Sequence, residues 1–224
     1  MIKVKLTRVT ENPILAIEEA ASNCYDSKPS KTGRIMKACY KNGHHSVLEF
    51  ADFTFHIEGV SRALLAQLTR HRVASYAVRS QRYCSEDNFG YVIPKSIEDN
   101  SSLAKKYIEF MDATQAFYSE LQKEGVPNED ARFVLPNACE TVLELKMNGR
   151  ELIHAMNERL CRRAQWEIRE LFKAMKTCIE SYSEECREFS KFLVPKCYAN
   201  FPYVFCTEHE SCGIAPKLEE VYKR

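Results

Sequence analysis

Residues 70–83 of the chain read RHRVASYAVRSQRY. The stretch holds four arginines, one histidine and two serines, and Arg62 adds a fifth guanidinium upstream. No acidic side chain and no lysine occurs between Gly59 and Ser85. Arginine presents a planar fork of donors that can grip phosphate or carboxylate through two hydrogen bonds. Because so many like charges repel one another, the stretch predicts an anionic ligand.

The composition sets the class of protein. The chain has 224 residues, 45% hydrophobic and 28% charged, which is typical of one large globular domain. The formal net charge is +1, so the basic cluster is local, whereas proteins that coat nucleic acids usually carry a basic excess throughout. No apolar run approaches the ~20 residues of a membrane helix, and the N-terminus lacks a signal-peptide core. The chain is therefore expected to have no membrane span. Its ten cysteines are expected to be reduced thiols in a cytoplasmic protein.

Hydrophobic periodicity predicts an α+β fold, with long helices packed on a mixed or antiparallel sheet. Strands are expected at 2–9, 51–57, 91–94 and 141–147. Helices are expected at 13–24, 34–41, 62–70, 101–124 and 128–135, with one long helix from 149 to about 183. Residues 72–82 are expected to form a loop. We assign residues 1–194 to one domain and 195–224 to a tail containing cysteine and proline.

Three local patterns give more specific expectations. Gln67, Arg70 and His71 are spaced i, i+3 and i+4, so one helix face would present all three. Asn148 reads as an N-cap, with the glutamate three residues later completing a capping box. Trp166 is expected in the core because its ring buries a large area. On the helix at 101–124 the apolar stripe is expected to comprise Leu103, Tyr107, Phe110, Met111, Phe117 and Leu121.

The spacing of Arg70, His71, Arg72 and Ser80 resembles the signature of the flavin-dependent thymidylate synthases. Three further segments resemble that family. They are Gly43-His44 with Ser46, Glu49 and a Phe-Thr-Phe strand; Ala131-Arg132 with Leu135-Pro136; and Asn148, Arg150, His154 and Arg159 followed by Gln-Trp-Glu. The resemblance covers most of residues 40–170. Val78 departs from it, because the family usually has a polar or acidic side chain there.

This resemblance implies the thymidylate-synthase-complementing fold and the conversion of dUMP to dTMP. The methylene group would come from 5,10-methylenetetrahydrofolate and the electrons from NADPH by way of bound FAD. The family is a homotetramer whose active sites are built between chains. Arg159 would be catalytic. The implied FAD-binding residues are Ser46, Glu49, Arg70, His71, Arg72, Asn148, Arg150 and His154. The implied dUMP-binding residues are Gln67, Arg70, Ser80, Gln81, Arg82, Arg132 and Arg159.

Helical geometry adds an expectation about Arg159. At ~100° per residue, Arg150 and His154 lie within ~40° of each other, whereas Arg159 lies ~180° from Arg150 on a straight helix. We therefore expect Arg159 to reach an active site different from the one that Arg150 and His154 reach. A kink near Met156 or Asn157 would remove this expectation, but no proline or glycine is there to cause one.

Two other interpretations remain open. The arginine stretch fits a phosphate- or nucleic-acid-binding module, although that class does not account for Ser46, Arg150 and Arg159. In the tail, Cys197, Cys206 and Cys212, with His209, fit either a structural metal site or packing of reduced thiols. Their spacing is not a zinc-finger pattern, so we assign no metal.

Overall fold

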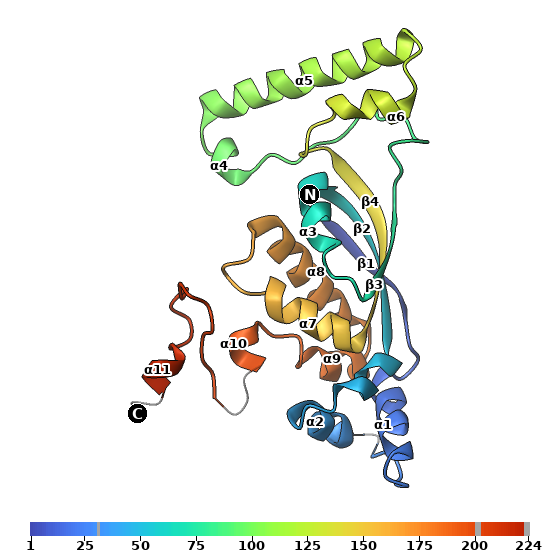
Figure 1. Cartoon of the computed structure of the whole chain (residues 1–224), viewed down its shortest axis with the longest axis vertical. Coiled ribbons are helices and arrows are strands. Elements are labelled where there is room, and N and C mark those ends of the chain that lie inside the picture. Colours follow the sequence, from blue (N-terminus) through green and yellow to red (C-terminus); the bar gives the residue numbers. More distant parts are fainter. Residues whose placement is uncertain (31, 200–202, 222–224) are drawn as a thin grey trace. The chain divides into compact units, whose positions relative to one another are not determined.

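The computed structural model describes residues 1–30, 32–199 and 203–221. Its sheet has four strands, β1 (Lys3–Val9), β2 (Asp52–Ser61), β3 (Ala74–Val78) and β4 (Glu140–Asn148), in the order β1-β2-β4-β3 (Figure 1). Thr10 N donates to Asp52 O near one end of the β1–β2 pair. Gly59 lies against Met1 at the other end, so β1 and β2 run antiparallel. The predicted α+β class is confirmed.

The described chain divides into two compact units, and each is described by itself. Unit 1 comprises Met1–Lys3, Ile57–Arg70 and Tyr76–Glu144. Unit 2 comprises Val4–His56, His71–Ser75 and Leu145–Arg224. The separate prediction of a domain at 1–194 with a tail at 195–224 stays a prediction. No described helix has both the length and the hydropathy needed to cross a membrane.

Unit 1 contains one long helix, four shorter helical segments and a small core. Its helices are α3 (Arg62–Leu68), α4 (Lys95–Glu98), α5 (Ser101–Lys123), α6 (Asn128–Ala131) and the 3-10 turn η2 (Arg132–Val134). Ser61 caps α3, because its hydroxyl accepts from Leu64 N. Phe89, Met111 and Cys139 form a buried cluster beneath α5.

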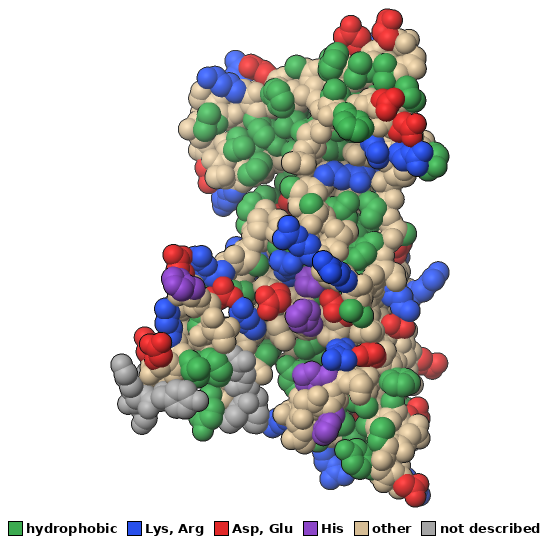
Figure 2. Space-filling model, in the orientation of Figure 1, with side chains coloured by type: hydrophobic (Ala, Val, Ile, Leu, Met, Phe, Trp, Pro, Cys, Tyr) green, Lys and Arg blue, Asp and Glu red, His purple; other side chains and the backbone are tan. Residues whose placement is uncertain are grey.

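The expected apolar stripe of α5 is confirmed at Met111 and at Tyr107, which packs against this cluster, and is wrong at three other positions. Met111 is buried, but the side chains of Leu103, Phe110 and Phe117 are 49%, 61% and 49% exposed. The buried face instead includes Tyr118, whose hydroxyl accepts from the backbone N–H of Glu86 and is thereby satisfied inside the core. Figure 2 shows hydrophobic side chains on the visible surface of this helix.

Unit 2 contains the remaining described helices. They are α1 (Pro13–Asn23), α2 (Arg34–Lys41), the 3-10 helix η1 (His45–Phe50), α7 (Gly149–Arg159), α8 (Trp166–Tyr182), α9 (Glu184–Ser190), α10 (Lys196–Ala199) and α11 (Leu218–Val221) (Figure 1). The strand alternation predicted at 51–57 is confirmed by burial of Phe53, Phe55 and Ile57. Phe53 meets Phe189 of α9 at a ring-centroid distance of 4.8 Å, which joins sheet to helix in one core.

Four other expectations about secondary structure are wrong. Residues 74–78 form β3 instead of loop, and Tyr91 makes only an isolated bridge to Cys139 where a strand was expected. The helix after Ser61 ends at Leu68, so Gln67, Arg70 and His71 do not share a helical face. The long helix from residue 149 is two helices, because Gln165 caps a new one by accepting from the N–H groups of residues 167 and 168. At the start of that new helix Trp166 is 39% exposed, so the expectation that it lies in the core is also wrong.

Candidate functional site

A cavity of about 520 Å³ in unit 2 lies over α2, η1 and α7. Four of the residues implied to bind FAD line it, namely Glu49, Asn148, Arg150 and His154. The remaining lining residues are Tyr40, His45, Leu48, Val73, Glu151, Ile153 and Asn157. Figure 2 shows histidine, basic and acidic side chains gathered over α7 and α2. The volume falls in the range typical of small-molecule sites.

The start of α7 fixes one edge of this cavity. Asn148 Oδ1 accepts from Glu151 N at 2.9 Å, so the predicted N-cap forms. Gly149 allows close packing here, because a Cβ atom would lie 2.7 Å from Leu48 O and 3.2 Å from the Phe189 ring. The glycine N–H also donates to Ala51 O at 2.6 Å. These contacts hold the first turn of α7 against η1.

Arg150 faces Glu49 across the cavity mouth. Its Nη1 donates to Glu49 Oε1 at 2.7 Å, and both side chains are about half exposed at 54% and 44%. Exposed pairs of this kind contribute about 0.2–1 kcal/mol. Glu49 therefore orients the Arg150 guanidinium only weakly, and an anionic ligand can compete with Glu49 for it.

An aromatic pair and an unsatisfied amide also line the cavity. The rings of Tyr40 and His45 stack at 5.3 Å with an interplanar angle of 18°. Burial raises the pKa of Tyr40, and a hydrogen bond from the Asn157 side chain partly offsets the rise. Asn157 Oδ1 is buried and has no hydrogen-bond partner among the described residues. A flat ring carrying an N–H group would satisfy both features.

Beside the cavity, His71 lies buried between two charged side chains. Its Nδ1 is 3.1 Å from Glu151 Oε1, and its Nε2 accepts from Arg159 Nε at 2.9 Å. Burial lowers the pKa of His71 to about 4, with further lowering by Arg159 and His154. The ring is thus neutral at pH 7, with its proton on Nδ1 directed at the carboxylate. Burial raises the pKa of Glu151.

The geometry of α7 agrees with the expectation that Arg159 points away from the ligand of Arg150 and His154. The helix runs unbroken from Gly149 to Arg159, and Arg159 is not among the described residues that line the cavity. It nevertheless reaches His71, whose ring meets that of His154 edge-on at 6.0 Å. Whether Arg159 serves a different active site stays a prediction.

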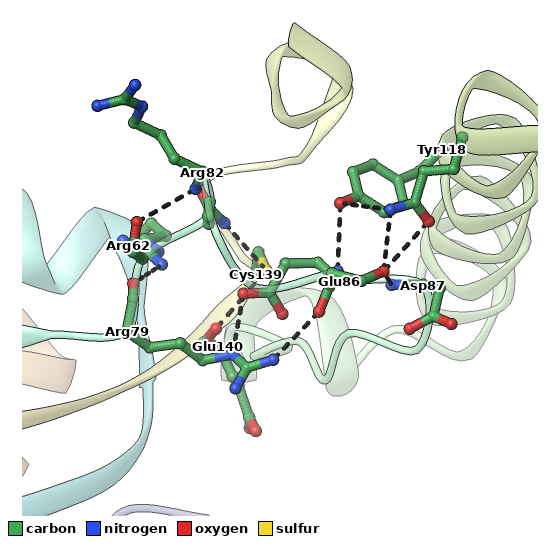
Figure 3. Close-up of polar contacts among 12 residues, drawn as sticks. Arg62, Arg79, Arg82, Glu86, Asp87, Tyr118, Cys139 and Glu140 are labelled. Carbon is green, nitrogen blue, oxygen red and sulfur yellow. Dashed lines mark hydrogen bonds and ion pairs between the residues drawn. The ribbon is translucent and has the colours of Figure 1, made fainter. Parts of the chain in front are cut away.

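In unit 1, Arg62, Arg79 and Arg82 have protein partners, and those of Arg62 and Arg79 are drawn in Figure 3. Arg79 Nε donates to Glu86 Oε1 at 3.1 Å, and Glu86 is 7% exposed. Arg62 donates to the backbone carbonyl of Arg79 at 2.8 Å. Arg82 pairs with Glu129 at 2.9 Å. Two guanidinium groups of the stretch are thus neutralised by carboxylates of the protein, one directly after the acid-free stretch and one distant in sequence. The sequence had predicted neutralisation by a ligand.

The other implied dUMP-binding residues also lie in unit 1. Ser80 Oγ accepts from Arg82 N, and Gln81 donates to the Cys139 thiol at 3.8 Å. Arg132 Nε donates to the backbone carbonyl of Glu129 at 3.0 Å, whereas Arg82 pairs with the carboxylate of the same residue. Gln67 is half-buried and Arg70 is exposed.

Four implied FAD-binding residues are not in the cavity lining, namely Ser46, Arg70, His71 and Arg72. Ser46 is exposed on η1, and Arg72 is exposed beside the buried His71. Neither is among the described residues that line the cavity, and in the Gly-His-His segment it is His45, not His44, that lines it. His44 instead lines a separate hollow with Tyr25 and Arg34.

Comparison with known proteins places the chain in a family. A family model described as "Thymidylate synthase complementing protein" matches residues 5–183. A flavin-dependent thymidylate synthase of Clostridium tetani is 36% identical, covering 99% of this chain and 97% of its own. One from Geobacter sulfurreducens is 44% identical over 76% of this chain and 78% of its own. The chain belongs to the flavin-dependent thymidylate synthases.

A solved structure agrees with the fold of this thymidylate synthase family. Thymidylate Synthase X from Helicobacter pylori, whose crystal structure contains FAD and dUMP, superposes with a TM-score of 0.69. It is 21% identical and covers 87% of this chain and 99% of that one. At this identity the likeness establishes the fold, which confirms the thymidylate-synthase-complementing type.

Several cavity residues of this family member were missed in the sequence. Ile153 and Asn157 lie three and seven residues after Arg150, so the helical spacing that selected His154 was sufficient to find them. Glu151 was assigned to a capping box, but its carboxylate meets a histidine 80 positions away. No local pattern predicts that contact. Tyr40 likewise carries no signal before the chain is folded.

Proposed function

We propose that this chain converts dUMP to dTMP, taking the methylene group of 5,10-methylenetetrahydrofolate and using FAD reduced by NADPH. Membership of the flavin-dependent thymidylate synthases supports the reaction class. The observation that carries the assignment is the cavity of about 520 Å³ beneath Arg150 and His154, with its stacked rings and its unsatisfied amide oxygen.

The residues of this cavity fit a flavin dinucleotide. Arg150 offers a guanidinium for phosphate, and it lies in the first turn of the eleven-residue α7, at the positive end of the helix dipole. The Tyr40–His45 pair offers a flat surface for a ring, and Asn157 Oδ1 accepts from a ligand N–H group. When bound, FAD carries the electrons that reduce the transferred carbon.

Arg159 is the proposed catalytic residue. A guanidinium next to the uracil ring would stabilise negative charge that develops as the ring is activated. The bond from Arg159 Nε to neutral His71 fixes the plane of this guanidinium, and Glu151 fixes the imidazole tautomer. His71 and Glu151 are thus positioning residues in this scheme.

For dUMP, the proposed phosphate-side groups are Arg82 and Arg132, with Arg70, Ser80 and Gln81 as further donors. Gln67 has both a donor and an acceptor for the imide edge of uracil. Arg82 must exchange Glu129 for the ligand, and both of these side chains are about half exposed. A carboxylate that is already accessible to water leaves at small cost.

The assembly and location that go with this function are a cytoplasmic homotetramer with active sites shared between chains. The test mixes inactive Arg150→Ala chains with inactive Arg159→Ala chains under conditions of subunit exchange. If sites are shared, some mixed sites draw both intact residues from different chains and activity returns. Continued inactivity, with exchange proven and FAD still bound by Arg159→Ala, would show that one chain supplies both residues.

The reaction itself is tested by release of tritium from dUMP labelled at C5. Release should require 5,10-methylenetetrahydrofolate, NADPH and the FAD-loaded protein together. Arg150→Ala should lose flavin, whereas His44→Ala, exposed in a separate hollow, should retain it. A colourless protein whose spectrum does not change on adding FAD would contradict the proposal.

A further inference from the structure

Four of the ten cysteines converge on one small cavity in unit 2. Cys161 comes from the connection between α7 and α8, Cys197 from α10, and Cys206 and Cys212 from the segment that follows α10. We call this set the thiol cavity. All ten cysteines of the chain are free of disulfides. Burial raises the pKa of Cys197 and the three neighbouring thiols raise it further, so the four sulfurs lie within electrostatic range.

The size of the thiol cavity restricts what it can hold. Its volume is about 30 Å³, against about 520 Å³ for the proposed flavin cavity. An organic ligand usually needs a pocket of about 300–1,000 Å³, whereas a water molecule needs only about 10–15 Å³. A single ion is therefore the size of ligand that fits among these sulfurs.

The charges around the thiol cavity suit an anionic metal–thiolate centre. Arg162, Arg163 and Lys196 line it, and Glu208 is the one carboxylate among its described lining residues. Lys196 pairs with Glu208, and Arg163 pairs with Glu210 at 3.0 Å. A divalent ion bound by four thiolates has two net negative charges. The three cations less the two carboxylates leave one positive charge, which offsets half of this.

The polypeptide around the thiol cavity has little else to hold it. Within residues 195–199 and 203–221, Cys206 and Ala215 are the buried hydrophobic residues. Secondary structure in these ranges is limited to two four-residue helices and a single bridge between Cys206 and Lys217. Segments that bury so little apolar surface are commonly stabilised by a disulfide or a structural metal.

We propose that Cys161, Cys197, Cys206 and Cys212 bind one Zn²⁺ ion as a tetrahedral structural site that fastens residues 195–199 and 203–217 to the end of α7. Zinc favours closed sites of four thiolates. Within the described residues no three metal-binding side chains already stand in ligating positions. The thiols must therefore rotate toward the ion, lose their protons and close to ~2.3 Å from it. This site is separate from the flavin cavity and differs from the tail set considered in the sequence, since Cys161 replaces His209.

The experiment uses the full-length, reduced protein produced in zinc-containing medium and purified without chelator. Mass spectrometry of the metal content should give about one zinc per chain, and X-ray absorption at the zinc edge should give sulfur neighbours at ~2.3 Å. Cobalt in place of zinc should give a strong thiolate-to-metal charge-transfer band. Substoichiometric zinc, or a first shell of nitrogen and oxygen, would overturn the proposal.

Substitution of single cysteines tests which of them bind the zinc ion. Cys206→Ser should lose the bound zinc, while the matched control Cys39→Ser, at 7% exposure against 8% for Cys206, should keep it. If Cys206→Ser fails to fold, the half-buried Cys161→Ser and Cys212→Ser give the same readout. Zinc retained by both of these variants overturns the assignment. Zinc content does not depend on dTMP formation, so metal in an inactive protein would support this site while counting against the proposed function.

Discussion

Replacement of His71 by glutamine should remove a defined part of the pH dependence of folding. The buried imidazole has a pKa of about 4 in the folded chain, against 6.5 for an ordinary histidine. Between these values the unfolded chain binds a proton that the folded chain does not, so acid favours unfolding. The stabilising effect of keeping the ring neutral is intact above pH 6.5 and is lost as the pH falls toward 4.

The magnitude follows from the shift. A change from 6.5 to about 4 corresponds to about 3 kcal/mol in full. About 2 kcal/mol of this falls between about pH 7 and pH 5, where few other groups should interfere. Burial raises the pKa of Glu151, which gives an opposite slope, but Glu151 is present in both the wild type and the variant. Glutamine keeps one donor for Glu151 and one acceptor for Arg159.

The assay is urea unfolding at about pH 7 and pH 5, at one protein concentration because dissociation of an oligomer would add its own term. The free energy of unfolding should fall by about 2 kcal/mol less in His71→Gln than in wild type. His44→Gln, at an exposed position in the same unit, should behave as wild type. An unchanged slope in His71→Gln would show that the imidazole titrates normally, and would remove the argument for a fixed tautomer beside Arg159.

Three further outcomes are expected. Gly149→Ala places a Cβ atom 2.7 Å from Leu48 O, so the free energy of unfolding, measured by denaturation, should fall by about 1–3 kcal/mol. FAD should also bind more weakly, as measured by flavin fluorescence. Unchanged stability would contradict this packing. Asn157→Leu removes the unsatisfied oxygen, and FAD affinity should fall about tenfold, whereas equal affinity would show that the oxygen meets no ligand. Glu129→Gln releases Arg82, so calorimetry should show dUMP binding up to about fivefold tighter, and weaker binding would refute the pairing argument.

Sequence reasoning succeeded where one continuous helix decides the geometry. Asn148 was identified as a cap from its residue type and position, and the cap forms. Arg150 and His154 were placed on one face from a four-residue spacing, and both line the cavity. Such predictions hold because the 3.6-residue period leaves little freedom once a helix exists. The family resemblance rested on the same segments.

It failed where the partner of a side chain is distant in sequence. Arg82 and Glu129 are 47 positions apart, and His71 and Glu151 are 80 apart, so no local pattern joins them. The break before Trp166 was missed because neither proline nor glycine marks it, and Gln165 is not a favoured cap type. Part of the buried face of α5 was missed because the helix has more apolar residues than its core can take.

The arginine stretch shows why composition overstates the local charge. Its fourteen residues suggest one uniform basic surface, but their side chains meet very different surroundings. His71 is buried and neutral, Arg79 is tied to the nearly buried Glu86, and Arg82 shares an exposed pair with Glu129. The Arg82–Glu129 pair is exposed, and such a pair is worth about 0.2–1 kcal/mol. A phosphate can therefore displace Glu129 from Arg82 at small cost. The same phosphate would gain little from Arg79, because removing its partner would leave the Glu86 carboxylate buried and unpaired. The anion predicted from the sequence should thus be bound by the exposed arginines and by Arg82, while Arg79 serves to hold the chain in place.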